Sequence, residues 1–147
     1  MKHNKIKKIL IENFENFEKS IEWLKRSFNQ CKKIGIKEKY SKDEFDYFEN
    51  LCSRYGRSID IFISKVLRSI DLMELENIGT NLDVANRAEK RGLIDSVDEL
   101  IEMKALRNEI VHEYVEARLQ EKFKKILEFS ERLFIFYERC KKYIEKY

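Results

Sequence analysis

The sequence contains no proline and only four glycines in 147 residues. Both residue types interrupt helices, so their scarcity favours long, continuous helices. Hydrophobic residues make up 43% of the chain and charged residues 39%, a balance typical of a folded helical protein and not of a disordered segment. We therefore expect an all-α protein, and a chain of this length is expected to form a single domain, residues 1–147.

Cysteine pairs, a strong net charge and long apolar runs are also absent. Cys31, Cys52 and Cys140 are far apart in the sequence, with no C-x-x-C pair or nearby histidine, so we expect reduced core residues and no metal site or cofactor. A net charge of +3 argues against a duplex DNA-binding protein and restricts any RNA contact to a local surface.

No run approaches the roughly 18 apolar residues of a membrane span, and no targeting segment is recognised, so no membrane contact and a cytoplasmic location are expected. The basic residues between Lys2 and Lys8 are interpreted as a solvated first turn, with an RNA-contacting arm as the alternative.

Apolar residues recur at alternating spacings of four and three, the pattern of helices that pack on one face. The first stripe is Leu10, Phe14, Phe17, Ile21, Leu24, Phe28 and Cys31. Gly35 and Gly92 mark helix ends, while Ser41 with Glu44 and Ser96 with Glu99 have the spacing of capping boxes. The predicted helices are 5–34, 42–76, 83–91, 96–114 and 117–145, which form an antiparallel bundle of four long helices plus one short helix. Gly56 interrupts the second helix, and close helix approach is its ordinary explanation.

Polar side chains fall on the apolar side of the helix predicted for 96–114. On a wheel of about 100° per residue that starts at position 97, apolar residues gather between about 240° and 320°. These are Leu100, Met103, Val111 and Tyr114. Arg107 falls within this face at about 280°, Asn108 and His112 lie on its shoulder at about 20° and 60°, and Leu106 lies outside it at about 180°. Buried polar groups without partners cost several kcal/mol, and positions that break a local pattern are frequent at functional sites. The ordinary alternatives are a core arginine paired with a carboxylate of another helix, and a helix-end histidine whose hydrogen bonds are satisfied.

The run from Arg107 to Tyr114 has the order Arg-x4-His-x-Tyr, with asparagine after the arginine. This run, together with the segment 86–94 before it, resembles the signature of the HEPN superfamily and specifically of its HepT-like toxin branch. The resemblance covers about residues 45–146. It implies a HEPN-like helical bundle, a symmetric homodimer that brings two copies of the motif to one cleft, and a metal-independent ribonuclease. It also implies that Arg107 and His112 are catalytic and that Asn108 assists them.

The same residue types suit cleavage of RNA by its own 2′-hydroxyl. His112 can accept the hydroxyl proton near neutral pH, and Arg107 can stabilise the charge that develops on the phosphate oxygens. On an ideal helix, however, residues five apart lie about 140° apart around the axis, so Arg107 and His112 do not share one stripe. Either the long arginine side chain spans this gap or the helix loosens near His112.

Tyr114 is expected one loose turn beyond Arg107, on nearly the same stripe. The resemblance implies that a partner nucleotidyltransferase antitoxin, of the MNT type, modifies this tyrosine with AMP and so blocks RNA. The alternative for Tyr114 is a half-buried packing tyrosine with a solvated hydroxyl. For the chain as a whole, the alternative to a ribonuclease toxin is a non-catalytic binding subunit of a nucleotidyltransferase, in which Arg107 holds a nucleotide phosphate.

Overall fold

The computed structural model describes residues 2–74, 76–77 and 79–147, and within these residues every regular element is helical. The elements are α1 (Lys2–Ile34), α2 (Lys42–Ile61), the π-helical turn η1 (Phe62–Leu67), α3 (Arg68–Met73), α4 (Asn81–Lys90), α5 (Val97–His112), α6 (Glu116–Gln120) and α7 (Phe123–Ile144). The prediction of an all-α protein is confirmed. In the described part of the chain, none of the helices combines the length and the apolar character needed to cross a membrane.

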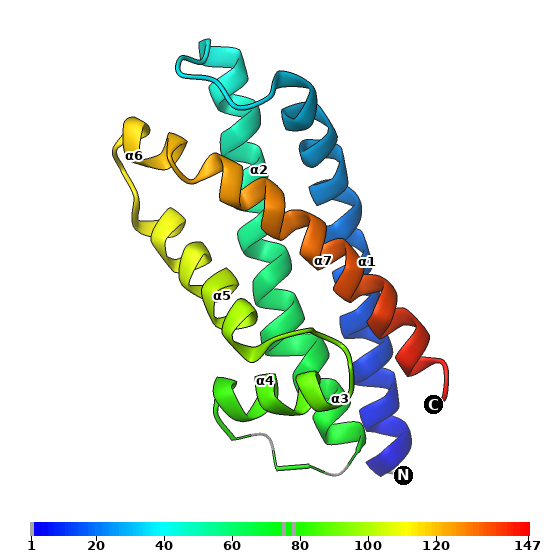
Figure 1. The fold of residues 1–147 in the computed structure, drawn as a ribbon. Helices are drawn as coiled ribbons and strands as arrows, with labels where there is room; N and C mark the ends of the chain where they lie inside the picture. Colours follow the sequence, from blue (N-terminus) through cyan, green and yellow to red (C-terminus); the bar gives the residue numbers. More distant parts are fainter. Residues whose placement is uncertain (1, 75, 78) are drawn as a thin grey trace.

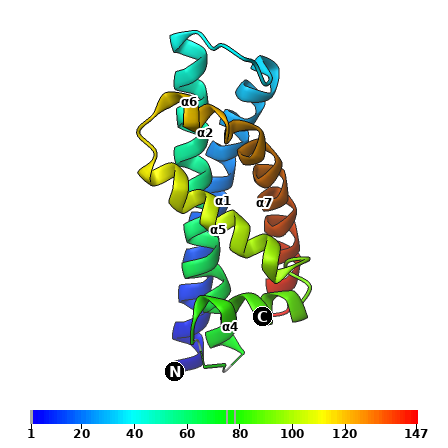
Figure 2. The same ribbon diagram turned by 60° about the vertical axis from the view of Figure 1, so that its left-hand side comes forward.

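Four long helical rods alternate in direction and pack side by side, as Figure 1 and Figure 2 show. The rods are α1, the continuous run α2–η1–α3, α5 and α7, and α2 packs against the other three. The short helix α4 lies across the end of the bundle where both termini are found (Figure 1). The predicted helical bundle is therefore confirmed at this level.

Two of the predicted helices differ from those observed. The helix predicted for 117–145 is divided into α6 and α7 by a turn at Glu121 and Lys122. This turn allows both Leu119 and Phe123 to be buried. The helix predicted for 96–114 ends at His112, and the segment 113–115 is not helical. Position 75, inside the predicted helix 42–76, lies outside the described residues.

The helix-end signals in the sequence correspond to observed caps. Gly35 and Gly92 have φ values of 78° and 77°, the left-handed conformation that glycine adopts without strain. Ser41 and Glu44 form a complete capping box at the start of α2. Ser96 accepts a hydrogen bond from the backbone of Glu99, but the Glu99 carboxylate pairs with Arg132 instead of returning to the cap.

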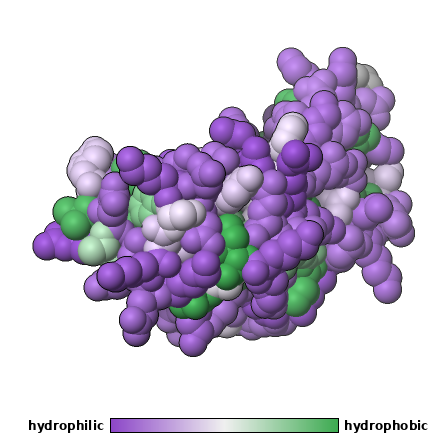
Figure 3. Space-filling view, turned by 90° about the horizontal axis from the view of Figure 1, so that it is seen from above, coloured by the Kyte–Doolittle hydropathy of each residue, from purple (hydrophilic) through white to green (hydrophobic). Residues whose placement is uncertain are grey.

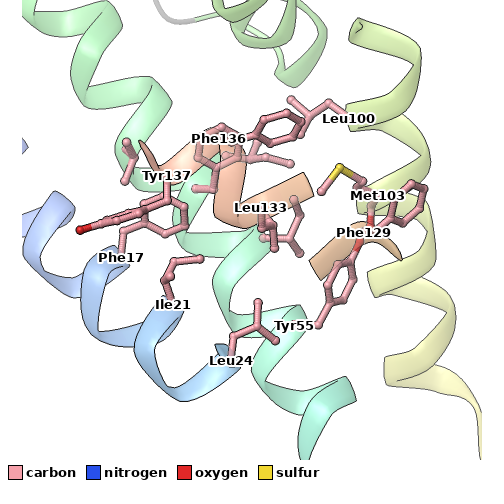
Figure 4. Close-up of a cluster of buried hydrophobic side chains, with 14 of the residues drawn as sticks. Phe17, Ile21, Leu24, Tyr55, Leu100, Met103, Phe129, Leu133, Phe136 and Tyr137 are labelled. Carbon is pink, nitrogen blue, oxygen red and sulfur yellow. Dashed lines mark hydrogen bonds between the residues drawn. The ribbon is translucent and has the colours of Figure 1, made fainter. Parts of the chain in front are cut away.

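The core lies between the four rods and contains the aromatic side chains shown in Figure 4. Phe62 of η1 stacks on Phe17 of α1 at 5.4 Å and on Phe136 of α7 at 5.7 Å between ring centroids. The fully buried Tyr55 donates a 2.7 Å hydrogen bond to the backbone carbonyl of Met103, which ties α2 to α5 beside Gly56. The three cysteines are buried and free, as predicted.

A buried carboxylate joins α3 to α4. Asp71 is fully buried and accepts hydrogen bonds from Arg91 and, at 3.1 Å, from Arg87. The neighbouring Glu74 accepts hydrogen bonds from Tyr143 of α7 and Tyr147. These contacts hold α4 and the C-terminal end of α7 against the same end of the bundle.

Candidate functional site

A cavity of about 390 Å³ lies between α2 and α5, at the height of Gly56. Its lining residues are Cys52, Ser53, Gly56, Arg57 and Asp60 from α2, and Arg107, Ile110 and Val111 from α5. An added Cβ at Gly56 would lie 3.5 Å from Cγ of Arg107, an ordinary van der Waals distance. The close approach expected at Gly56 is therefore to a side chain of α5, and it does not require glycine sterically.

Arg107 is the charged group at the centre of this cavity. Its side chain is 28% exposed, and Nη2 lies 2.7 Å from Oδ2 of Asp60. Nη1 donates to Oδ1 of Asn108 at 3.2 Å. The second oxygen of Asp60 lies 2.6 Å from Nζ of Lys104, one turn earlier on α5. Asp60 thus holds two cations of α5 against α2. This matches the ordinary alternative for Arg107, in which the arginine pairs with a carboxylate of another helix.

One donor of the guanidinium remains without a partner. Nε of Arg107 is the buried side-chain atom for which no hydrogen bond is found within the described residues. An unpaired buried donor costs roughly 1–3 kcal/mol in a folded protein, and this atom has almost no exposed surface. The guanidinium is therefore anchored on one side by Asp60, and the 28% of the side chain that stays exposed lies at the cavity.

Asn108 and His112 do not point into the core. Both are exposed, and neither lines the cavity that contains Arg107. Asn108 contacts Arg107 through its hydrogen bond to Nη1. Asn108 itself lines a separate pocket between α4, η1 and α5. His112 is the last residue of α5. Within this chain, the structure brings together Arg107 and Asn108, whereas His112 faces solvent.

Tyr114 is not on the stripe of Arg107. Because α5 ends at His112, Tyr114 lies in the non-helical segment 113–115, and 89% of its surface is exposed. Both the expected position one turn beyond Arg107 and the alternative of a half-buried packing tyrosine are therefore wrong. The segment is held by a 3.0 Å hydrogen bond from the backbone of Val115 to the Glu113 carboxylate.

The buried face of α5 differs from the one expected from the wheel. Leu106 is buried with Leu100 and Met103, whereas Val111 is 49% exposed. The expected face was rotated because apolar residues occur on both sides of this helix. Two of the others are each about half exposed: Ile101, on the side that carries His112, and Val111, which lines the Arg107 cavity. Figure 3, which looks down on the bundle, shows hydrophobic atoms at its left-hand edge over the corner between α5 and α6.

Two residues of the site were not identified from the sequence. Asp60 follows the buried Ile59 but lies beside the apolar stripe and not in it, so the pattern gave no signal for its cationic partners. Arg57 is exposed and lines the cavity. The sequence signal for this residue was its position one helical turn before Asp60. Burial raises the pKa of Cys52 to about 12, with smaller contributions from Cys31 and Glu49, so this thiol remains protonated.

Among the described residues, no group of three or more His, Cys, Asp or Glu side chains is placed to hold a metal ion. Comparison with known proteins gives no match to a family model, to a curated protein or to a solved structure.

Proposed function

We propose that this protein is a metal-independent endoribonuclease of the HEPN type and the toxin of a toxin-antitoxin pair. The observation that carries the proposal is the Arg107 guanidinium, which Asp60 anchors at a cavity between α2 and α5 and which remains partly exposed there. Carboxylates and phosphates are the groups that a fixed guanidinium binds best, and phosphate is the one that RNA supplies. His112 lies on the same helix, exposed and accessible to substrate.

In the proposed reaction, His112 accepts the proton of an RNA 2′-hydroxyl. The 2′-oxygen attacks the adjacent phosphorus, and the bond to the 5′-oxygen of the next nucleotide breaks. Arg107 stabilises the negative charge on the phosphate oxygens, while Asn108 holds the guanidinium in orientation. The departing 5′-oxygen takes a proton from water or from the imidazolium, and the products carry a 2′,3′-cyclic phosphate and a 5′-hydroxyl.

A homodimer supplies what one chain lacks. Arg107 and His112 are separated by about 140° around α5, and His112 lines no part of the Arg107 cavity. The side of α5 that carries His112 also presents Ile101, which is 49% exposed. Burial of this side against a second copy about a two-fold axis would remove apolar surface from water and place His112 of each copy near its partner chain.

The proposal is tested with purified protein, total RNA and EDTA. His112→Ala should reduce cleavage by about 10²- to 10⁴-fold, the usual loss for a general base, with unchanged helical content by circular dichroism. His3→Ala is the matched control, since the chain contains only two histidines and His3 lies at the exposed start of α1. Arg107→Gln should also abolish cleavage. Cleavage that EDTA stops, or that survives His112→Ala, would refute the assigned roles.

We further propose that an MNT-type nucleotidyltransferase antitoxin silences the protein at Tyr114. The phenolic oxygen would attack the α-phosphate of ATP, pyrophosphate would leave, and the phenolic proton would pass to a base of the partner. The 89% exposure of Tyr114 supports this modification, because an enzyme can reach the hydroxyl. A bulky anionic group near the exposed end of α5 would repel RNA.

Intact-mass measurement tests the modification after incubation with ATP, magnesium and the partner. The wild-type protein should gain whole AMP increments and lose activity, whereas Tyr114→Phe should gain none and remain active. Tyr47→Phe is the control, because Tyr47 is another exposed tyrosine, at 41%. Equal gain by Tyr114→Phe would assign the modification to a different residue.

One observation favours a second function, a non-catalytic binding subunit of a nucleotidyltransferase. Arg107 lies in a cavity, and His112 does not line it. A nucleotide phosphate could bind Arg107 without any use of the histidine. This function predicts that Arg107→Gln weakens ATP binding, that His112→Ala has no effect, and that RNA is not cleaved.

A further inference from the structure

The chain has one tryptophan, and it lies on the surface. Trp23 of α1 is 52% exposed and lines a groove of about 370 Å³ between α1 and the α2–η1 run. The guanidinium carbon of Arg54 lies 4.8 Å from the centre of the indole ring. Arg54 is itself held by a 2.7 Å hydrogen bond to the buried Ser27. The indole is therefore supported on one side, and the rest of its surface is open to a ligand.

The groove beside Trp23 carries cations that are not neutralised. Lys19, Arg57 and Lys65 all line it and are exposed. None of the three takes part in a salt bridge within the described residues, unlike Arg132 and Arg139, which share Asp95 on another part of the surface. Three free cations beside an exposed aromatic ring are the combination by which proteins bind single-stranded nucleic acids: backbone phosphates contact the cations and bases stack on the ring.

Arg57 connects this groove with the candidate site. It lines the groove on one side of α2 and the cavity of Arg107 on the other. Asp60, one turn after Arg57 on α2, already pairs with Lys104 and Arg107. Among the described residues, the positive charge of Arg57 therefore has no carboxylate partner. Arg57 therefore lies between the cavity of Arg107 and the groove of Trp23.

We propose that the groove lined by Lys19, Trp23, Arg57 and Lys65 binds the single-stranded RNA next to the cleaved bond. A base stacks on Trp23, and Arg57 holds the phosphate between that base and the reacting phosphate. This inference rests on the proposed function, since it names single-stranded RNA as the substrate of the same site. It assigns binding residues on α1 and α2, far in sequence from the Arg-His motif.

The single tryptophan reports directly on this contact. A 2′-O-methyl oligonucleotide of about ten nucleotides, within the usual range of single-strand sites, cannot be cleaved by its own 2′-hydroxyl. Its addition should quench the tryptophan fluorescence, and a blunt duplex of the same sequence should not, because its bases are already stacked. Saturable binding seen with a labelled oligonucleotide but without any change in tryptophan fluorescence would overturn the proposal.

Three variants complete the test, with binding measured by the anisotropy of the labelled oligonucleotide. Trp23→Ala should weaken binding by about 5- to 150-fold, the loss typical of one stacked base, and Trp23→Phe by less. Arg57→Gln should weaken binding and reduce its salt dependence by about one phosphate contact. Arg139→Gln is the control: it removes the same charge from another surface and should have little effect. An equal loss with Arg139→Gln would show general electrostatic attraction and overturn the proposal.

The inference and the proposed function fail in different ways. If the variants weaken binding as expected but the wild type cleaves no RNA, the proposal of RNA binding in the groove is supported and the nuclease assignment is wrong. If the wild type cleaves in a His112-dependent manner and Trp23→Ala retains the wild-type kcat/KM on single-stranded RNA, the nuclease stands and the groove proposal fails.

Discussion

Replacement of Asp60 by asparagine removes the charge that Lys104 and Arg107 share while preserving the shape of the side chain. The two ion pairs have N to O distances of 2.6 and 2.7 Å, and their side chains are 28–32% exposed. Exposed pairs contribute about 0.2–1 kcal/mol each, and these pairs are partly buried, so we expect the free energy of unfolding to fall by about 1–2 kcal/mol. For a chain of this size, that loss lowers Tm by about 3–6 °C.

Thermal unfolding followed by circular dichroism measures this effect, with Glu109→Gln as the matched control. Glu109 is an exposed carboxylate of α5 without a salt bridge in the described part of the chain, and its loss should change stability by less than about 0.5 kcal/mol. A double-mutant cycle of Asp60→Asn with Arg107→Gln should give a coupling of about 0.5–1 kcal/mol. An unchanged Tm for Asp60→Asn, or strictly additive losses, would refute the role of Asp60 as an anchor.

The same variant separates positioning from packing in the nuclease assay. Without Asp60, a negative charge next to the proposed phosphate site is lost, so KM for RNA should fall. The guanidinium is then held less firmly, so kcat should also fall. A loss of stability without any change in either constant would mean that Asp60 serves the fold alone.

Two further predictions concern stability. Gly56→Ala places a methyl group in ordinary contact with Arg107 and improves helix propensity by up to about 1 kcal/mol, so Tm should rise by about 2–4 °C; a lower Tm would show that the added methyl group strains the α2–α5 contact. Burial alone would raise the pKa of Glu74, but hydrogen bonds from Tyr143 and Tyr147 and the charges of Arg91 and Lys146 lower it below its ordinary value of 4.5. Its stabilisation is therefore complete above that value and is lost as the pH falls through the lower folded pKa. Urea denaturation at neutral pH and near pH 3 should show a smaller loss of stability on acidification for Glu74→Gln than for the wild type, and equal losses would contradict this assignment.

The helices were predictable because their signals are local. A stripe with alternating spacings of four and three residues marks α1 from Leu10 to Cys31, and every apolar member of that stripe except the partly buried Phe28 is buried. Gly35 and Gly92 adopt the left-handed conformation expected at helix ends. The division of the last helix was not predictable in this way, because residues on both sides of the turn at Glu121 have good helix propensity. The turn depends on the burial of Leu119 against the bundle.

The orientation of α5 could not be obtained from its own sequence. Leu100, Met103 and Leu106 form the buried side, but Ile101 and Val111 are apolar and exposed. A wheel weights all apolar residues equally, so the outer residues rotated the expected face away from Leu106 and toward His112. The partner of Arg107 depends on which helix packs beside it, and that information belongs to the tertiary structure. Trp23 was missed for the same reason, since only the neighbouring α2 completes its groove.

The exposed apolar side of α5 bears on how the proposed site is completed. A helix in a monomer is expected to keep its apolar residues on one face, yet α5 has them on two faces, with Arg107 toward α2 and His112 at the exposed end. The five-residue spacing that separates the two side chains by about 140° is a disadvantage if both must act from one chain. Across a two-fold axis the same spacing is useful, because one side of the helix can face its own cavity while the other faces the partner copy. The spacing of the motif and the exposed Ile101 on the side of His112 are therefore consistent with the proposed arrangement, in which α5 forms the interface and each site uses groups from both chains.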